Sequence, residues 1–454
     1  MIKGSLRISS KPHLWYVVLS LIYGTSLTIV AAPGEDISQA RSGFINGEPS
    51  DFLGTAAGLF YSQIPNLPWG WFRNLTVLQF VLAIVSLNSL VPVKNASKRS
   101  IFAFLILHYV VSIFSVQQSR DGTLLAFTLC GLALLKKSLF ALKRKVLIAS
   151  SSICLLIFAL SFRPALAPIS CIFVIFLVRI YSRHRLGSLI SFALVLANIL
   201  IVLMPTILEL KLSDELVAKR SFPVQTILIH DLGFAACQSA SPTTADRAVE
   251  ALRPLATDDG YANRICQYFR INTWQALVGF VQPTATTQNL VPPLNIARES
   301  GTYEKLRRGW VNTFVQDPKT LFQAKIVFLT QIVFSSQTQI YLSSTDRTSK
   351  TPVALLISAF TSLGNLIVVP WIILSRTYLL APISLFLIAA LLTYLQLRSG
   401  ACRREVLLMP AAILLTFLTN SIFFVSDNAR YVTPFALLSF VGLMICKFQD
   451  SEVK

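Results

Sequence analysis

The chain has 454 residues, of which 54% are hydrophobic and only 13% are charged, and its formal net charge is +19. Soluble domains carry about 25% charged residues, so this composition leaves too little polar surface for a water-exposed globule. The basic excess does not indicate a nucleic-acid partner, because the Lys and Arg residues stand in short clusters between apolar runs, a distribution typical of membrane proteins.

The sequence predicts an all-α polytopic membrane protein. Apolar runs long enough to cross about 30 Å of hydrocarbon recur from end to end. Backbone groups in lipid must be satisfied within the segment, which favours helices, and the runs lack the period-two alternation of a transmembrane barrel. Twelve spans are expected, at about 14–32, 74–93, 100–117, 122–135, 146–162, 164–181, 187–208, 324–342, 352–375, 377–396, 405–425 and 431–447.

The basic clusters set the predicted orientation, with both termini in the cytoplasm. The span at 324–342 is interrupted by glutamines, but removing it would move the basic cluster at 398–404 outside, so it is retained. Pro33 disfavours signal-peptide cleavage after Ala32, so the first span is expected to stay as an anchor. The expected location is a plasma or inner membrane, and the short loops favour a bacterial one. With twelve spans, the cytoplasmic side holds the basic clusters at 3–11, 94–99, 136–145, 183–185, 347–350 and 398–404.

Three parts follow from this arrangement. Residues 1–208 form a seven-helix transmembrane module with a first outer loop at 33–73, residues 209–323 form an extracytoplasmic loop domain, and residues 324–454 form a module with helices eight to twelve. The loop domain holds 11 of the 21 acidic residues, which indicates that it is solvated.

Cysteine usage bears on the same domain. Cys237 and Cys266 are the two cysteines expected on the outer side, where disulfides are permitted. The sequence leaves a bond between them and two unpaired thiols as equal alternatives. Metal-ligand spacings such as CxxC or HExxH do not occur, so no metal site is assigned.

Charged residues recur where the spans meet the outer surface. Such residues can simply extend to the lipid headgroups, and an adjacent acid and base can pair within their turn. Ionisable groups in turns this short are nevertheless costly unless paired or functional, and the arginine fork suits phosphate oxygens. A site for a phosphate-bearing substrate is therefore suggested by Glu35, Asp36, Arg120, Asp121, Arg163, Arg376, Asp427 and Arg430.

Four stretches resemble the GT-C glycosyltransferase superfamily, which includes protein O-mannosyltransferases and the aminoarabinose transferases of lipid A. Residues 119–127 (Ser-Arg-Asp-Gly-Thr-Leu-Leu-Ala-Phe) are similar to an outer turn and helix that an Asp opens in that superfamily, and residues 35–36 match its acidic first outer loop. Residues 427–434 (Asp-Asn-Ala-Arg-Tyr-Val-Thr-Pro) resemble the start of a late helix, and residues 310–325 resemble an interfacial helix that returns to the membrane. The first loop lacks the His-Pro pattern of many members, so the sugar and the acceptor stay open.

The resemblance implies transfer of a sugar from a polyprenyl-phosphate donor to a lipid, glycan or protein acceptor on the extracytoplasmic face, with inversion. Asp36 is implied as the general base, with Glu35 as its competitor. Asp121 is implied as a second carboxylate that orients the acceptor or helps a metal.

Three arginines, Arg163, Arg376 and Arg430, are implied as ligands of the donor phosphate, with Arg120 and Asp427 in support. No cofactor is required by the resemblance. Some members use a divalent metal, but nothing in this sequence demands one.

Two other functions fit a polytopic chain with large outer loops. An O-antigen-type polysaccharide polymerase would rely mainly on outer-loop arginines, whereas the GT-C reading needs the carboxylate after the first span. A flippase or transporter for lipid-linked sugars would show mid-span polar residues or paired repeats with broken helices, and few mid-span charges occur here.

Overall fold

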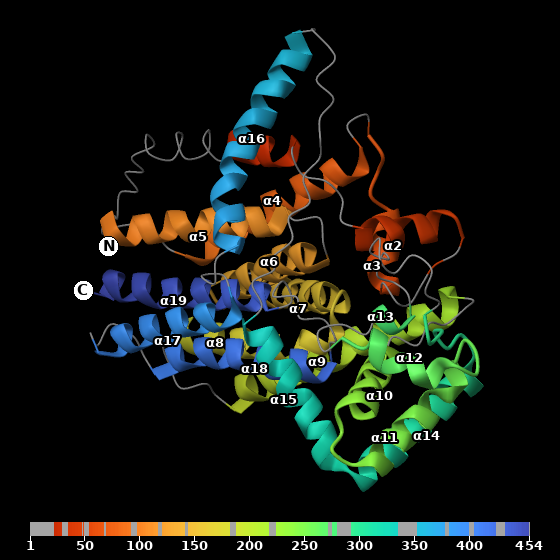
Figure 1. The fold of residues 1–454 in the computed structure, drawn as a ribbon. Helices are drawn as coiled ribbons and strands as arrows, with labels where there is room; N and C mark the ends of the chain where they lie inside the picture. The colour runs from red at the N-terminus through yellow and green to blue at the C-terminus, as the bar shows by residue number, and fades with distance from the viewer. Residues whose placement is uncertain are drawn as a thin grey trace, which may run out of the picture.

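The computed structural model describes residues 22–29, 35–47, 49, 54–67, 70–91, 98–116, 120–140, 144–181, 188–217, 224–270, 275–278, 292–334, 352–376, 381–398, 404–423 and 432–453. Most of them are helical, and within these ranges no strand occurs beyond one isolated bridge between Ala256 and Leu294. Figure 1 shows a bundle of helices with two smaller helical parts at one end. The all-α part of the predicted fold is therefore confirmed.

The helices of the first module follow the predicted spans. Among the described residues, four segments are long and apolar enough to cross a membrane: α4, α6, the η2–α8 pair and residues 191–216 of α9. Two helices extend beyond the predicted spans, because α6 continues past 135 and α9 continues past 208. The bounds are α4 (Trp71–Leu90), α5 (Lys98–Val116), α6 (Arg120–Phe140), α7 (Lys145–Ser161), η2 (Pro164–Leu166), α8 (Ala167–Tyr181) and α9 (Ser188–Leu216).

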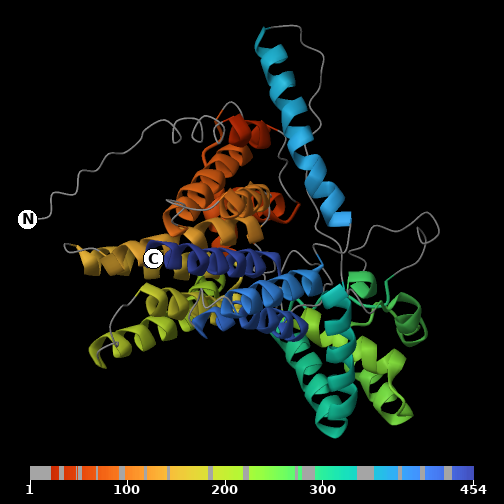
Figure 2. The same cartoon turned by 90° about the vertical axis from the view of Figure 1, so that its left-hand side faces the viewer.

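Helix α15 covers only 324–334 of the span predicted at 324–342, and residues 335–342 lie outside the described part of the structure. Helices α16 to α19 overlap predicted spans, and their described apolar stretches are shorter. One of them, α16, runs across the direction of the bundle helices in both Figure 1 and Figure 2. The structure therefore supports a membrane protein, while the number of twelve crossings stays a prediction. The bounds are α15 (Pro318–Phe334), α16 (Pro352–Arg376), α17 (Pro382–Arg398), η5 (Arg404–Leu407), α18 (Leu408–Phe423) and α19 (Thr433–Val453).

The bundle buries an apolar core and presents apolar side chains outward as well. Leu87, Phe176 and Phe435 are buried between helices that are far apart in the sequence. Phe102 and Phe192 are exposed on the outside. A helix that is hydrophobic all round belongs in a large core or in lipid, so the apolar exterior fits a membrane environment.

Lys136 marks one end of the bundle. Its Nζ donates to the backbone oxygens of Ser89 (2.7 Å) and Leu90 (3.0 Å) and lies 5.0 Å from the ring centre of Tyr181. The C-terminal ends of α4, α6 and α8 therefore meet here. The start of α6 lies sixteen residues away, roughly 24 Å along a helix, and Figure 1 shows the smaller helical parts at the opposite end from the α6 C-terminus. The predicted orientation requires this separation of basic cluster and outer loops.

The predicted first outer loop contains two short helices, α2 (Glu35–Ile45) and α3 (Thr55–Ser62), which pack on each other. Ile37 and Phe162 belong to the small apolar core that holds them against the bundle. Arg41 donates from Nε to the Tyr61 carbonyl (3.1 Å) and from Nη2 to the Ile64 carbonyl (3.4 Å). The Arg41 guanidinium thus donates to carbonyl oxygens at the C-terminal end of α3, where backbone acceptors lack a partner within the helix.

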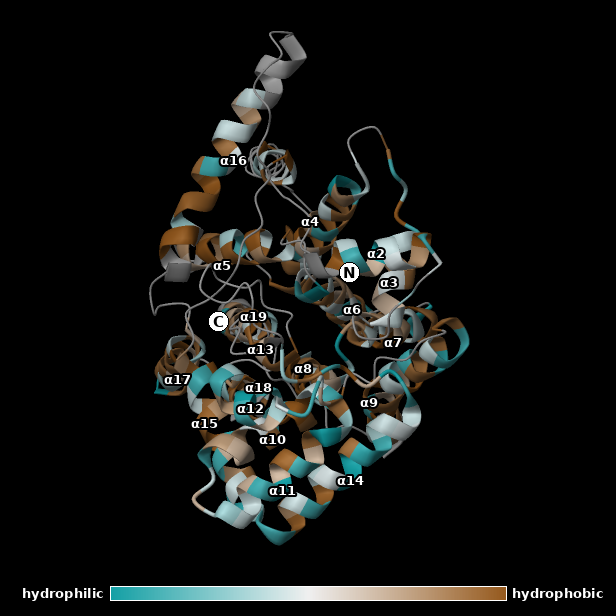
Figure 3. Cartoon of the chain, turned by 45° about the vertical axis from the view of Figure 1, so that its right-hand side comes forward, coloured by the Kyte–Doolittle hydropathy of each residue, from teal (hydrophilic) through white to brown (hydrophobic). Residues whose placement is uncertain are grey.

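The second outer part has an apolar core of its own. Cys237 and Cys266 form a disulfide with a 2.15 Å S–S distance, joining α10 to α12. Figure 3 shows that α11 and α14 are more hydrophilic than the bundle helices. The helices are α10 (Gln225–Gln238), α11 (Pro242–Leu252), α12 (Tyr261–Tyr268), α13 (Gln275–Val278) and α14 (Ser300–Gln316).

Helix α15 joins this domain to the bundle. Its Ala324 is buried in the domain core and its Phe328 in the bundle core. Lys325 donates to the buried carboxylate of Asp231 at 2.8 Å, and the indole nitrogen of Trp310 donates to the same carboxylate at 3.2 Å. The predicted boundary at 323/324 thus falls inside one continuous helix, which fixes the domain against the membrane module.

Candidate functional site

Two residues from the predicted set, Asp121 and Arg163, meet at the end of the bundle that carries the outer parts. Nε of Arg163 donates to Oδ1 of Asp121 at 3.0 Å, and Nη2 donates to Oδ2 at 3.3 Å. The Asp121 side chain is fully buried and that of Arg163 is 8% exposed. A buried ion pair is tolerated only with good geometry, and this two-point contact supplies it.

Local sequence explains where each partner stands. Asp121 lies in the first turn of α6, where the helix dipole favours a negative charge. Arg163 precedes Pro164 and has a non-helical backbone (φ −149°, ψ 71°), because a following proline disfavours the α conformation. The short turn after α7 therefore holds the guanidinium beside the start of α6.

The structure shows which residue holds the Asp121 carboxylate. This buried carboxylate is engaged by Arg163, 42 residues away in sequence, rather than by the neighbouring Arg120 alone. Arg120 is half-buried, and its guanidinium lies near Gly54, because a Cβ added there would be 3.4 Å from Nη1. Gly54 has φ +87°, a conformation that suits glycine.

A layer of buried polar side chains lies next to the ion pair. The hydroxyls of Tyr61 and Thr123 are 3.0 Å apart. With the Gln79 amide oriented to satisfy both of its ends, its nitrogen donates to the Ser115 carbonyl (3.0 Å) and its oxygen accepts from the Thr123 hydroxyl (2.6 Å) and backbone N–H (3.2 Å). This network ties α3 and α4 to the first turn of α6, two residues after Asp121.

Glu209 was missed as a site residue, although it lies close to this cluster. Its carboxylate accepts from the backbone N–H of Thr55 and of Ala56 (2.9 Å), and Ser213 pairs with the Thr55 hydroxyl at 2.7 Å. Helix α9 thus caps α3 across 154 residues of sequence. One feature of the sequence could have indicated it. In residues 209–216 leucines are interspersed with charged residues at a spacing that is compatible with a continued helix.

For the other predicted site residues, the structure describes no side-chain contact with Asp121 or Arg163. Glu35 and Asp36 open α2, and Arg376 ends α16, but their side chains lie outside the described part of the structure. Asp427 and Arg430 fall in 424–431, which is also outside it. Among the residues that are described, no three His, Cys, Asp or Glu side chains gather as a metal site would require.

The arrangement offers a fixed arginine and carboxylate close to the first outer loop, at the predicted outer boundary of the membrane. Comparison with protein families, with characterised proteins and with solved structures finds no match for this chain. The function therefore has to be argued from the site and from the sequence pattern.

Proposed function

We propose that this chain is a polytopic membrane glycosyltransferase of the GT-C type that moves a sugar from a polyprenyl-phosphate donor to an acceptor on the extracytoplasmic face. The observation that supports it most is the buried pair of Asp121 and Arg163 close to the predicted first outer loop. Charges at membrane depth are costly, and pairs retained there commonly serve binding or catalysis.

Arg163 and Asp121 have complementary roles in this proposal. Both carboxylate oxygens of Asp121 are held by the guanidinium, so Asp121 serves to orient Arg163 rather than to take a proton. Arg163, with Arg120 close by, faces the donor phosphate, whose oxygens match the guanidinium fork. Arg376 and Arg430 are the proposed further phosphate ligands.

The proton acceptor is proposed to be Asp36 or Glu35, at the start of α2. The acceptor hydroxyl oxygen attacks the anomeric carbon, the bond from that carbon to the phosphate oxygen breaks, and polyprenyl phosphate leaves. The hydroxyl proton passes to the carboxylate, and the configuration at the anomeric carbon inverts. The packing of α2 on α3, and the bonds from α3 to α6 and α9, would hold the base in place.

A transfer assay tests the proposal. Isolated membranes receive a polyprenyl-phosphate-linked radiolabelled sugar, and label in the acceptor fraction is measured for the native chain and for Asp36→Asn, Glu35→Gln and Asp121→Asn, each at matched protein level. The matched control is Asp259→Asn, which removes an exposed carboxylate in the outer domain. We expect loss of transfer in Asp121→Asn and in one of the two α2 variants, with the control unchanged.

Other outcomes point elsewhere. Full transfer in all three site variants would refute the assignment of these carboxylates. Extension of a glycan by whole repeat units, insensitive to the two α2 changes, would indicate a polysaccharide polymerase instead. Movement of the lipid-linked sugar across the membrane without transfer by the native chain would indicate a flippase.

A further inference from the structure

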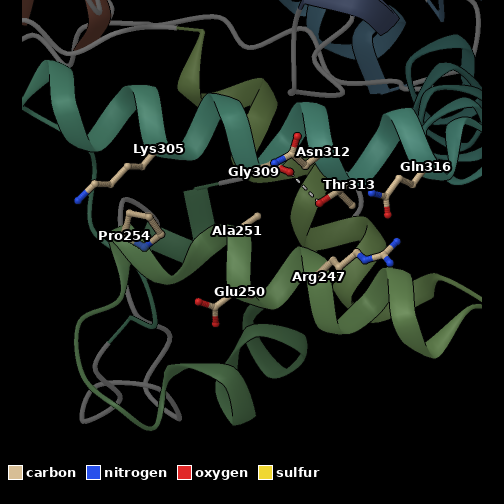
Figure 4. A pocket seen from close by; sticks show the side chains of 9 residues that line it. All are labelled: Arg247, Glu250, Ala251, Pro254, Lys305, Gly309, Asn312, Thr313 and Gln316. Carbon is tan, nitrogen blue, oxygen red and sulfur yellow. Dashed lines mark hydrogen bonds between the residues drawn. The ribbon is translucent and has the colours of Figure 1, made fainter.

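A groove runs along the surface of the outer domain between α11 and α14. Its volume is about 530 Å³. The two helices are antiparallel, because the Thr244 hydroxyl donates to Asp317 (3.0 Å) at one end while Pro254 and Lys305 line the same hollow at the other. Figure 4 shows the lining side chains arranged along the groove, with Lys305 near Pro254 and Arg247 near Gln316.

The floor of the groove is set by two small residues. A Cβ added to Gly309 would lie 2.7 Å from the Cβ of Ala251, so the helices are in direct contact at this point. Ala248, Leu252 and Leu306 are buried below them in the domain core. The groove is thus built on a packed helix pair rather than on a loop.

Two cations of the groove have no partner among the described residues. Neither Arg247 nor Lys305 makes a hydrogen bond or an ion pair to any residue whose placement the structure describes. Other arginines of the domain are engaged: Arg253 contacts Glu250 at 3.3 Å, and Arg307 contacts Glu304 at 2.8 Å. Positive charge is therefore available in the groove although the domain has acids that could have neutralised it.

Apart from the carboxylate of Glu250, the remaining lining residues are uncharged. Asn312 and Gln316 add side-chain amides, which can donate to and accept from sugar hydroxyls. Glu250 lies on the outer wall, and in Figure 4 it points away from α14. Along the helix axis Arg247 is level with Thr313, eight residues from Lys305, so the two cations are roughly 12 Å apart.

We propose that this groove binds an anionic oligosaccharide, one whose sugars carry carboxylate or phosphate groups. The spacing of the cations suits a ligand with at least two charged sugars in an extended chain, because a single ring is too short to reach both. This inference rests on the proposed function, in which such a glycan is the acceptor, and it assigns the outer domain the task of holding that acceptor.

The test is a binding measurement on the purified full-length protein in detergent. Three probes are titrated at two salt concentrations: an oligogalacturonate, a phosphorylated maltooligosaccharide, and the unmodified maltooligosaccharide as the neutral reference. The variants are Arg247→Gln and Lys305→Gln, with Arg308→Gln as the control, since Arg308 is exposed on α14, contacts Glu304 and does not line the groove. Because these positions are on the surface, thermal midpoints are expected to stay the same.

We expect at least one anionic probe to bind, with the dissociation constant raised roughly threefold to fivefold by each groove substitution, as for an exposed ion pair. The probe that binds identifies carboxylate or phosphate as the recognised group. Equal binding of the neutral probe, equal loss in Arg308→Gln, or no binding of either anionic probe would overturn the inference.

The outcome can be separated from that of the proposed function. Asp121→Asn is expected to abolish transfer and to leave binding of the anionic probe unchanged. If the native chain binds the anionic probe through the groove but transfers no sugar, the groove inference stands and the proposed glycosyltransferase function is refuted. If the native chain transfers sugar but the groove variants bind the probe as well as it does, the function stands and the groove inference is refuted.

Discussion

Arg163 donates hydrogen bonds to both carboxylate oxygens of Asp121, although it lies 42 residues further along the chain. Both side chains are almost completely buried. Each group is acceptable at this depth only because the other is there. The contact locks the start of α6 to the turn between α7 and α8, and it fixes the orientation of a guanidinium near the first outer loop.

Breaking the pair is predicted to be costly. Asp121→Ala or Arg163→Ala leaves an uncompensated buried charge, and each is expected to lower the free energy of unfolding by about 3–5 kcal/mol. The matched control is the exposed pair of Glu250 and Arg253, where Arg253→Ala should cost no more than about 1 kcal/mol. Denaturation by SDS in mixed micelles, followed by tryptophan fluorescence, measures both.

The double variant Asp121→Leu with Arg163→Leu separates a structural role from a functional one. Replacing both charges by apolar groups should restore much of the stability, because no charge is left unpaired. If the pair only holds helices together, sugar transfer would return with stability. Under the proposed function it stays lost, so recovered transfer would contradict that role.

Sequence reasoning found both partners of this contact but not the contact itself. Charged residues in turns between apolar runs are conspicuous because lipid makes them costly, and this made Asp121 and Arg163 candidates. The choice of Arg163 over the adjacent Arg120 depends on how α6 packs against α7 and α8, which one sequence does not encode in any local pattern. The helical composition and the approximate positions of the bundle helices were predictable from hydropathy alone, whereas the helix ends and the short helices of the two loop parts were not.

Glu209 illustrates why the end of a helix could not be predicted from hydropathy. The apolar run ends near 208, so a hydropathy pattern stops the helix there, yet α9 continues to Leu216 because Glu209 and Ser213 find partners on α3. A partner 154 residues away gives no signal in the segment itself. The same limit applies to Lys136, whose carbonyl partners on α4 let α6 run past its predicted end.

The Glu209 cap on α3 is predicted to position the first outer loop. Glu209→Gln replaces one acceptor oxygen by an NH₂ group facing a backbone N–H, and about 1 kcal/mol of local stability should be lost, as for a helix cap. Limited proteolysis of the 46–54 connection should become faster, and transfer should fall. Glu215→Gln, on the same helix and exposed, is the control and should change neither.

The disulfide of the outer domain is predicted to stabilise it through loop closure. Cys237 and Cys266 are 29 residues apart, and a loop of this size corresponds to about 3–4 kcal/mol in the chain-entropy treatment. Cys237→Ser with Cys266→Ser should therefore lower the thermal midpoint of the domain. Cys154→Ser, at an exposed position on α7, should shift stability by less than about 0.5 kcal/mol. An equal shift in both variants would contradict the expectation.

Asp317 is predicted to make the corner between α14 and α15 sensitive to acid. Its carboxylate accepts from the Thr320 hydroxyl (2.7 Å) and backbone N–H (3.1 Å) and from the Thr244 hydroxyl (3.0 Å). These bonds, that of the Thr320 side chain first, lower the pKa of Asp317 below its ordinary value of 3.8. A lowered pKa in the folded state means stabilisation that is complete above the unfolded-state pKa and is lost as the pH falls through the folded-state pKa.

The corresponding measurement compares the thermal midpoint of the native chain with that of Asp317→Asn from pH 7 down to pH 3. The variant should be less stable by about 1 kcal/mol at pH 7, because its single amide oxygen cannot accept all three hydrogen bonds that the carboxylate accepts. The gap should close below pH 3.8, where the native carboxylate becomes protonated. A gap that stays constant over this range would show that the charge of Asp317 contributes nothing.

The orientation of the bundle gives the last prediction. Glu250 lies on the exposed side of α11 in the outer domain, and Lys145 opens α7 close to the basic end of the bundle. In a background where every cysteine except Cys237 and Cys266 is serine, Glu250→Cys should react with a membrane-impermeant maleimide in intact cells. Lys145→Cys should react only after the membrane is permeabilised, because basic clusters stay on the cytoplasmic side. Labelling of both positions in intact cells would show that the membrane does not separate them. Labelling of Lys145→Cys alone would show that the topology is the reverse of the one on which the outer-face reaction depends.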